Sequence, residues 1–334
     1  MTDGLLRIGS VAVFPPLVLA PMAGLTDVTF RRAVRRCGGV GLVVSEILSS
    51  EGLVRGGRRT GDYLRMGPDE HPIALQISGA DPGHMAEAAR RCEAEGADVV
   101  DINMGCPVPK VTKGWCGAAL LREPLRAAAV ARAVVRAVSI PVTAKLRLGW
   151  SGSEITFLEV ARALEEVGVA SLTLHARTRE QGYAGRADWA RIGELKSAVS
   201  VPVVGNGDVT TPEEGMELFA STSCDAVMVG RAAVKNPWIF RQIECLRTSG
   251  TYAVPGLPDR LALVEAHFED LVEMGPPGLA LHRMKTFLGK YTAGIPGATS
   301  LRRSLDRSKS PQVLLKTFRE WAEPLRRDAP APSP

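Results

Sequence analysis

The chain has 334 residues, of which 45% are hydrophobic and 23% are charged, and its formal net charge is +5. This length and composition allow a sizeable buried core and favour one large domain accompanied by a small one. The sequence contains no run of about 18 uncharged apolar residues and begins with no signal-peptide pattern, so we expect a cytoplasmic protein with no membrane partner.

From Leu17 to about Cys245, short apolar runs of strand length alternate with longer amphipathic stretches. Runs such as LVLAP and DAVMVG lack polar alternation, as expected of parallel strands that are covered on both faces. This alternation favours an α/β fold, a closed (β/α)8 TIM barrel, over an open doubly wound sheet, and no strand is followed by the GxGxxG pattern of dinucleotide-binding sheets. The eight predicted strands are Leu17–Met22, Gly41–Glu46, Ile73–Ser78, Asp98–Asn103, Val142–Leu148, Ser171–Arg177, Val203–Asn206 and Ala226–Gly230.

Helices are expected between the strands and beyond the last one. Asp-Pro and Thr-Pro starts predict helices over Asp81–Glu95 and Thr211–Phe219. After a segment rich in Gly and Pro, the hydrophobic period becomes helical over Leu261–Met274, Leu279–Tyr291, Leu301–Asp306 and Val313–Trp321. We therefore predict a barrel domain (1–246), a linker (247–259), a small C-terminal all-α helical domain (260–326) and a disordered tail (327–334).

The C-terminal part of the chain is locally basic. Residues 282–334 contain 11 Lys and Arg against 4 Asp and Glu, an excess of 11 − 4 = +7. Such an excess can follow a phosphate backbone. It can equally be the solvated surface of a helical domain, and charge alone leaves both interpretations open.

Unusual polar residues and glycines follow the predicted strands, at the ends where such barrels carry their functional groups. Lys145 and Arg147, and likewise His175 and Arg177, are two residues apart, so each pair points to one face of its strand. Charge on the inward face is costly, and a bound anion or electron-rich ring would offset that cost. Glycines after the last two strands, with Arg231 beside them, indicate a phosphate-bearing cofactor.

Each of these residues also has a purely structural interpretation. A strand lysine can pair with a carboxylate, a single histidine is more often a satisfied core residue than a catalyst, and a glycine after a strand is usually a turn. It is their coincidence at one end of the barrel that favours a site. The six cysteines form no CxxC pair and have no histidines at metal-ligand spacing, so neither a disulfide framework nor a metal site is expected.

Eight segments carry a more specific pattern: APMAGLTDVTFRR (20–32), VVSEILSS (43–50), LQISGADP (75–82), DINMGCPVPKVTKGWCGAALL (101–121), PVTAKLRLGW (141–150), LTLHARTREQGY (172–183), PVVGNGDV (202–209) and VMVGRAAVKNPWIF (227–240). Together they resemble the tRNA-dihydrouridine synthase family. The similarity spans the barrel and continues more weakly into residues 282–305, which resemble that family's helical tRNA-binding domain. Trp115 and Cys116 depart from the family pattern, so the lid over the substrate is expected to differ in shape.

The resemblance implies that FMN lies across the mouth of the barrel and that NADPH or NADH reduces it. Lys145 would lie near the N1/C2 carbonyl edge of the flavin, where negative charge accumulates on reduction. The residues expected to contact FMN are Pro21, Met22, Ala23, Gln76, Lys145, His175, Asn206, Gly207, Asp208, Gly230 and Arg231.

The reaction implied by the resemblance is reduction of the C5=C6 bond of specific uridines in tRNA to 5,6-dihydrouridine. Hydride would pass from FMN N5 to C6, and a proton to C5. Cys106 matches the family's proton donor on the loop after the fourth strand, and its structural alternative is a buried apolar thiol. Asn103 would steady the uracil, and with Lys145 and His175 these residues form the expected catalytic set.

A uridine inside folded tRNA must be extruded to reach such a site, so phosphate contacts are expected on both sides of the mouth. The loop at residues 177–183 would supply one side and the basic C-terminal region the other. The residues expected to bind the uridine or its RNA are Asn103, Arg147, Arg177, Arg283, Lys285, Lys290, Arg302 and Arg303.

Two other functions remain open. An FMN-dependent barrel oxidoreductase that acts on a small molecule would share the phosphate features but would leave the basic helical domain unexplained. A non-catalytic tRNA-binding barrel protein would not need Cys106, Lys145 and His175 together. In each case we expect a monomer with no obligate protein partner.

Overall fold

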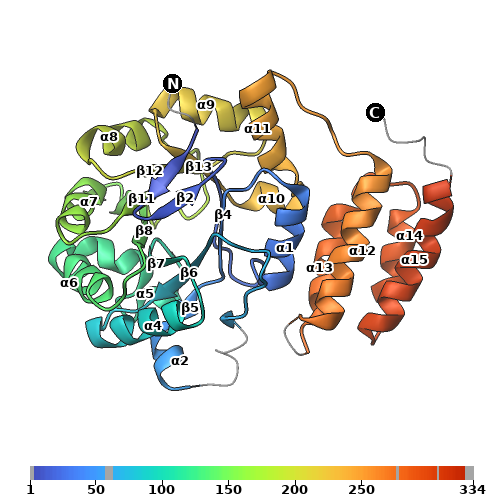
Figure 1. Ribbon diagram of the computed structural model, residues 1–334, viewed down its shortest axis with the longest axis horizontal. Helices are drawn as coiled ribbons and strands as arrows, with labels where there is room; N and C mark the ends of the chain where they lie inside the picture. Colours follow the sequence, from blue (N-terminus) through green and yellow to red (C-terminus); the bar gives the residue numbers. More distant parts are fainter. Residues whose placement is uncertain (1–3, 57–62, 276–277, 307, 328–334) are drawn as a thin grey trace.

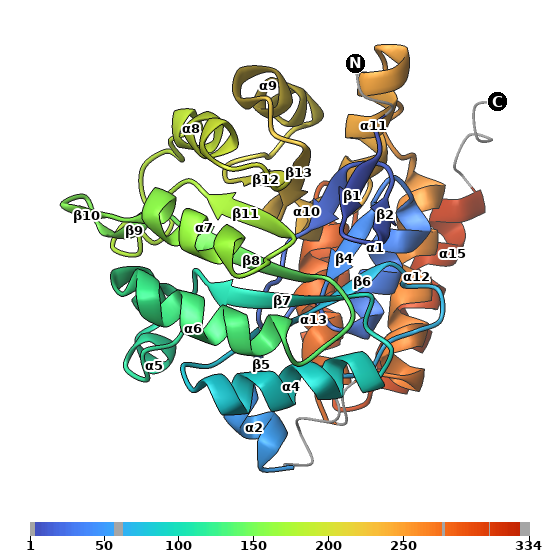
Figure 2. The ribbon, with the colours of Figure 1, turned by 60° about the vertical axis from the view of Figure 1, so that its left-hand side comes forward.

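The computed structural model describes residues 4–56, 63–275, 278–306 and 308–327, so all of the predicted tail except Arg327 lies outside the described residues. Its larger part is a closed barrel of parallel strands surrounded by helices (Figures 1 and 2). Neighbouring strands pair in parallel, and β13 pairs with β3 to close the ring. The barrel strands are β3 (Leu17–Leu19), β4 (Leu42–Val44), β6 (Ile73–Ser78), β7 (Val99–Met104), β8 (Val142–Arg147), β11 (Ser171–His175), β12 (Val203–Asn206) and β13 (Ala226–Val229). The predicted TIM barrel is confirmed.

Alternate residues of the strands belong to two separate apolar clusters. Leu17, Val43 and Val227 pack outward against the helices in the main core. Val18 and Leu42 pack inward with the other side chains that fill the barrel. Because both faces of the sheet are covered, the strands are apolar without alternation, which is why the sequence pattern identified them.

A β-hairpin that the sequence did not indicate fills the amino-terminal end of the barrel. Its strands, β1 (Leu6–Ile8) and β2 (Val11–Val13), pair antiparallel. Leu6, Ile8 and Val13 are buried among the inward residues of the barrel strands. Strands of two or three residues are too short to show a period, so this hairpin and that of β9 (Gly149–Ser151) and β10 (Glu154–Ile155) were not predicted.

Helices cover the outside of the barrel. The longer ones are α1 (Val28–Cys37), α4 (Pro82–Ala94), α6 (Pro124–Val135), α7 (Phe157–Glu166), α8 (Ala190–Ala198), α9 (Pro212–Thr222) and α11 (Ile239–Ser249). Shorter elements are β5 (Leu48–Ser49), α2 (Ser50–Val54), α5 (Pro109–Thr112), the 3-10 helix η1 (Gly117–Arg122) and α10 (Arg231–Lys235). The predicted helix starts at Asp81 and Thr211 are confirmed: Asp81 caps α4, and Thr211 forms a capping box with Glu214 at the start of α9. Among the described residues, no helix combines the length and apolar character that crossing a bilayer requires.

Four C-terminal helices pack together beside the barrel (Figure 1). They are α12 (Leu257–Glu273), α13 (Ala280–Tyr291), α14 (Ala298–Asp306) and α15 (Pro311–Arg327). Each predicted C-terminal helix is present, although the segment between α11 and α12 is shorter than the predicted linker. The helices contact the barrel through α1 and α10, where Phe287 stacks on Phe30 with ring centroids 5.1 Å apart.

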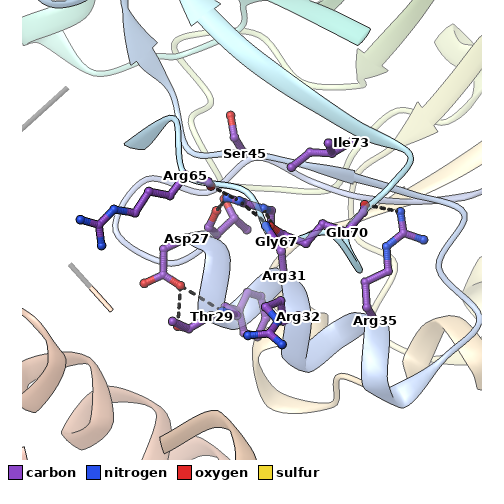
Figure 3. Close-up of polar contacts among 12 residues, drawn as sticks. Asp27, Thr29, Arg31, Arg32, Arg35, Ser45, Arg65, Gly67, Glu70 and Ile73 are labelled. Atoms are coloured by element: carbon purple, nitrogen blue, oxygen red, sulfur yellow. Dashed lines mark hydrogen bonds and ion pairs between the residues drawn. The ribbon is translucent and has the colours of Figure 1, made fainter. Parts of the chain in front are cut away.

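A buried ion pair fixes the connection that precedes β6 onto α1. Arg31 donates to both carboxylate oxygens of Glu70, at 2.6 and 3.2 Å, and to the main-chain carbonyls of Thr26 and Arg65 (Figure 3). Glu70 also accepts from the N–H of Gly67. Both charged side chains are almost fully buried, so each depends on the other for compensation.

We expect Arg31→Leu to lower the free energy of unfolding by about 3–5 kcal/mol, because the Glu70 carboxylate then stays buried without its counter-charge. The double variant Arg31→Leu, Glu70→Leu should recover much of this loss. Urea unfolding followed by circular dichroism measures both values. Equal destabilisation of the single and double variants would show that lost backbone hydrogen bonds, and not the unpaired charge, set the cost.

Candidate functional site

The inward side chains of the barrel change from apolar to polar toward the carboxyl ends of the strands. Since residues two apart share a face, positions that follow Ala74 and Val99 in the inner cluster also point inward. The polar inward residues are Gln76, Asp101, Asn103, Thr143, Lys145, Arg147, Thr173, His175 and Asn206. They gather at one end of the barrel, as the sequence analysis expected of functional groups.

A cavity of about 650 Å³ opens at this end of the barrel. It brings together most of the predicted cofactor residues: Pro21, Met22, Lys145, His175, Asn206, Gly207, Asp208, Gly230 and Arg231. The rest of its wall is formed by Ala20, Leu25, Tyr183, Val209, Thr210, Met228, Ala232, Val234, Lys235, Asn236 and Lys290. Ala23 and Gln76, which were expected to contact the cofactor, do not line this cavity.

Lys145 is an amine in the inner layer of the barrel whose charge depends on its surroundings. Its Nζ donates to Oδ1 of Asn206 at 3.0 Å. Burial, and after it the neighbouring Arg147, lowers the pKa of Lys145 to about 7, although the carboxylate of Asp101 opposes the shift. An anionic group bound in the cavity would favour the charged form of Lys145.

His175 is neutral and has a defined tautomer. Burial and the surrounding cations lower the pKa of its imidazole far below the usual value. A guanidinium nitrogen of Arg177 lies 3.3 Å from Nε2 of His175, and a guanidinium can only donate. The hydrogen-bond network therefore assigns the proton to Nδ1 and leaves Nε2 as the acceptor.

The end of the cavity next to β12 and β13 has small residues and one exposed guanidinium. Gly207 has φ of +129°, and a Cβ there would lie 2.7 Å from that of Ala187, so only glycine fits. The side chain of Arg231 is 61% exposed, 3.7 Å from Asp208 and 4.6 Å from the ring centroid of Tyr183. Arg231 thus offers donors to an anionic group in the cavity.

The loop that carries Cys106 is held by hydrogen bonds from the barrel interior. Oδ1 of Asn103 accepts from the N–H groups of Gly105 and Cys106, at 3.2 and 3.0 Å. Arg147 Nε donates to the carbonyl of Gly105 at 2.8 Å. Cys106 is half-buried and is not part of the cavity wall, although it follows β7 at the same end of the barrel.

A chain of side-chain hydrogen bonds continues from this loop to a buried carboxylate. Nδ2 of Asn103 donates to Gln76 at 2.8 Å, Nε2 of Gln76 donates to Asp101 at 2.6 Å, and Thr143 donates to the other oxygen of Asp101. Burial raises the pKa of Asp101 against the effect of these bonds. The sequence analysis did not select Asp101, although its two-residue spacing from Asn103 places it on the same face.

Arg147 and Arg177, which were predicted to touch the uridine or its RNA, also support the loop beside the cavity. Each side chain is 2% exposed. Arg147 donates to the carbonyls of Thr178 and Gly182, and Arg177 to those of Ala184 and Gly185 and to Asp208. These hydrogen bonds hold the 178–185 loop beside the cavity.

The family model described as Dihydrouridine synthase (Dus) matches residues 18–325 of the chain. The chain belongs to the dihydrouridine synthase family. It is 37% identical over 330 residues to tRNA-dihydrouridine synthase B of Xanthomonas campestris pv. campestris, covering 98% of each chain. It is 38% identical to the protein of the same name from Pseudomonas aeruginosa, covering 94% of this chain and 95% of that one.

Solved structures support the fold of this dihydrouridine synthase family member more distantly. Histamine dehydrogenase from Rhizobium sp. 4-9 matches with a TM-score of 0.56 at 15% identity, over 79% of this chain and 50% of that chain. A 2-naphthoyl-CoA reductase matches with a TM-score of 0.58 at 12% identity, over 72% of this chain and 51% of that chain. At these identities the likeness concerns the barrel fold alone.

The basic residues of the C-terminal helices lie in different environments in this family member. Lys290 lines the cavity. Lys285 donates to the carbonyl of Ser308, and Arg302 contacts Thr292 and Thr299. Arg303 is exposed on α14.

The prediction that Arg283 binds RNA needs a correction. It is 4% exposed and forms ion pairs with Asp27 and Glu46 of the barrel. A guanidinium in this position cannot reach an RNA phosphate, so Arg283 belongs to the contact between the helices and the barrel. Seven residues later on the same helix, Lys290 lines the cavity.

Tyr183 is the main cavity residue that sequence reasoning did not assign. Its ring lies 4.6 Å from the guanidinium carbon of Arg231 and 5.6 Å from that of Arg147. It ends the 177–183 segment, which was expected to face RNA, but no local signal indicated that the loop folds over the cavity. Its position depends on the carbonyl contacts of two buried arginines, which only the fold shows.

We expect Asn103→Ala to destabilise the protein by about 1–3 kcal/mol, since it leaves the N–H groups of Gly105 and Cys106 without their acceptor. The same change should speed alkylation of Cys106 by iodoacetamide, measured by peptide mass spectrometry. Asn103→Asp keeps the acceptor and is the matched control for the loop. Unchanged alkylation of Cys106 in Asn103→Ala would mean that Asn103 does not hold this loop.

Proposed function

We propose that this chain is an FMN-dependent tRNA-dihydrouridine synthase that uses NADPH or NADH to reduce the C5=C6 bond of uridines in tRNA to 5,6-dihydrouridine. One observation carries the proposal: Lys145, His175 and Arg231 line a single cavity, and the Cys106 loop, although outside the cavity wall, lies at the same end of the barrel. Membership of the dihydrouridine synthase family and the names of the relatives support it.

The residues of the cavity fit the chemistry of FMN. A volume of about 650 Å³ suits a ligand of this size. Arg231 and the close-approach glycine Gly207 would hold the phosphate, and Pro21 and Met22 would contact the flavin from the β3 side. Lys145 would donate to an electron-rich edge of the ring, where its charge is favoured. When bound, FMN would supply the hydride that adds to C6 of the uracil.

Cys106 would deliver the proton to C5 of the uracil. As the hydride arrives at C6, negative charge builds at C5 and its carbonyl neighbour, and an S–H group within reach can neutralise it. The backbone of Cys106 is fixed by Asn103 and the carbonyl of Gly105 by Arg147, so the thiol projects from an ordered loop. Asn103 therefore acts on the reaction by positioning Cys106, beyond its expected role at the uracil edge.

Transfer RNA is the substrate that the charged residues around the cavity suit best. A uridine extruded from the RNA would bring its flanking phosphates to the mouth of the barrel. Lys235 and Lys290 line that mouth, and Arg302 and Arg303 lie on α14 among the C-terminal helices. An FMN barrel that reduces a small molecule would leave the C-terminal helices without a role. A non-catalytic tRNA-binding barrel would leave Cys106 and Lys145 without one.

FMN affinity should depend on pH through Lys145. The pKa of Lys145 is about 7 in the free protein, and an anionic ligand raises it. Between the free and bound pKa values binding takes up a proton, so affinity should fall about tenfold from pH 7 to pH 9 and change little through Lys145 below pH 6. Fluorescence titration measures it, and Lys145→Met is the control, which should bind weakly without this slope. An identical slope in Lys145→Met would remove Lys145 from the flavin site.

Cys106→Ala should separate the two half-reactions. Flavin reduction by NADPH and tRNA binding should remain, because the thiol takes part in neither, whereas reoxidation by tRNA should slow by about 10²- to 10⁴-fold. Anaerobic stopped-flow absorbance of the flavin times each step. Reoxidation of Cys106→Ala by tRNA at the wild-type rate would exclude Cys106 as the proton donor. A wild-type flavin that tRNA cannot reoxidise would exclude the proposed function itself.

A further inference from the structure

One face of α13 reaches the barrel at two places. Arg283 and Lys290 are seven residues apart, which is two helical turns, so both project from the same side of the helix. Lys290 lines the cavity, and Arg283 is buried deeper against the barrel. Phe287 lies between them and stacks on Phe30 of α1. The helix is therefore part of the site at one end and part of the barrel contact at the other.

Arg283 joins two buried carboxylates. It donates to Oδ2 of Asp27 and, at 3.2 Å, to Oε2 of Glu46. Asp27 is the N-cap of α1, where its other oxygen accepts from the N–H of Phe30 and the hydroxyl of Thr29 (Figure 3). Glu46 follows β4 and is 4% exposed. Without the guanidinium, these two carboxylates would share a buried site with no counter-charge between them.

The second oxygen of Glu46 is bonded to the loop that follows β3. Oε1 of Glu46 accepts from the N–H of Gly24, which has φ of +77°. Inside this loop, Met22 N–H donates to the hydroxyl of Thr26 at 2.9 Å. The same loop supplies Pro21, Met22 and Leu25 to the wall of the cavity.

The position of this loop matters for the end of the cavity that contains Arg231. A Cβ built on Gly230 would lie 3.8 Å from the sulfur of Met22 and 3.4 Å from the Cβ of Ala20. Ala20 and Met22 thus lie beside Gly230, close enough that a side chain at this position would touch them. A displacement of the loop would change the space beside Arg231.

We propose that Arg283 and Glu46 are positioning residues for the cofactor cavity: docking of the C-terminal helices places Arg283 against Glu46, and Glu46 holds the β3 loop through Gly24. The proposal rests on FMN being the ligand of this cavity. It assigns the C-terminal helices a role in the flavin site, in addition to any contact with RNA. Arg283 acts through Glu46 and touches no reacting atom.

The same interface offers a matched control. Asp270 of α12 is 5% exposed and accepts from Arg32 and Arg36 of α1. This cluster also ties the C-terminal helices to the barrel through partly buried ionic contacts. Within the described part of the chain, no hydrogen bond of Asp270 involves the 21–25 loop, so loss of this cluster weakens docking without removing the acceptor of Gly24.

The test compares Glu46→Met, Arg283→Lys and Asp270→Asn in the full chain. Glu46→Met keeps the Arg283–Asp27 pair but removes the acceptor of Gly24, and Arg283→Lys keeps a charge but replaces the two-armed fork with a point charge. The readouts are FMN affinity by fluorescence titration, amide hydrogen exchange of the peptide that contains Gly24, and the thermal midpoint.

We expect at least tenfold weaker FMN binding and faster exchange at the Gly24 peptide in Glu46→Met, and a smaller loss of the same kind in Arg283→Lys. Asp270→Asn should keep FMN affinity within twofold of wild type, even if its thermal midpoint falls as far as that of Glu46→Met. Equal FMN affinity in Glu46→Met and wild type would overturn the proposal, and so would an equal loss in Asp270→Asn. If wild type binds no FMN, the proposed function fails, whereas the exchange at Gly24 still tests the link from Glu46 to the loop.

Discussion

Each strand of the barrel turns alternate side chains inward, and the free energy of burying those side chains governs the rest of the molecule. At the amino-terminal end the inward residues are apolar and pack against the β1–β2 hairpin. At the carboxyl end they are polar, and a buried polar group is stable only when it is hydrogen-bonded or paired. The barrel meets this demand with side-chain networks, such as the one that runs from Asp101 through Gln76 to Asn103. Lys145 donates to Asn206, yet its lowered pKa shows that burial still disfavours its charge.

The same demand explains why several polar residues build the site without facing the ligand. Arg147 and Arg177 place their donors on main-chain carbonyls, so they fix the loops that carry Cys106 and Tyr183. Arg283 supports the site at longer range, because it donates to Glu46 and holds that carboxylate in place. Few polar side chains keep a hydrogen-bonding group open to the cavity, and these are the side chains proposed to bind the cofactor. A side chain with a structural role thus has its hydrogen-bonding groups bonded to the protein, whereas one with a chemical role keeps them open to the ligand.

Much of the fold was predictable from the sequence, because strands covered on both faces leave apolar runs and helix starts leave capping residues such as Thr211. The cavity residues at the ends of β12 and β13 were predictable for the same reason, since the barrel fixes where strand ends lie. The environment of Arg283 was not predictable, because a basic residue on an amphipathic helix is expected to be exposed to solvent unless the face that docks on the barrel is known. Tyr183 was missed since its loop is shaped by two buried arginines, of which Arg147 lies more than 30 residues earlier in the chain. The sequence therefore predicted the helices and strands better than the contacts between them.

The most direct test of the proposed function uses tRNA from cells that lack dihydrouridine. The purified protein is incubated anaerobically with FMN, NADPH and this tRNA, and the nucleosides are analysed by mass spectrometry. The account predicts 5,6-dihydrouridine that appears only when FMN and NADPH are both present. Reduction of free uracil or of a small enone at a substantial rate, with no dihydrouridine in the tRNA, would contradict it and favour a small-molecule oxidoreductase.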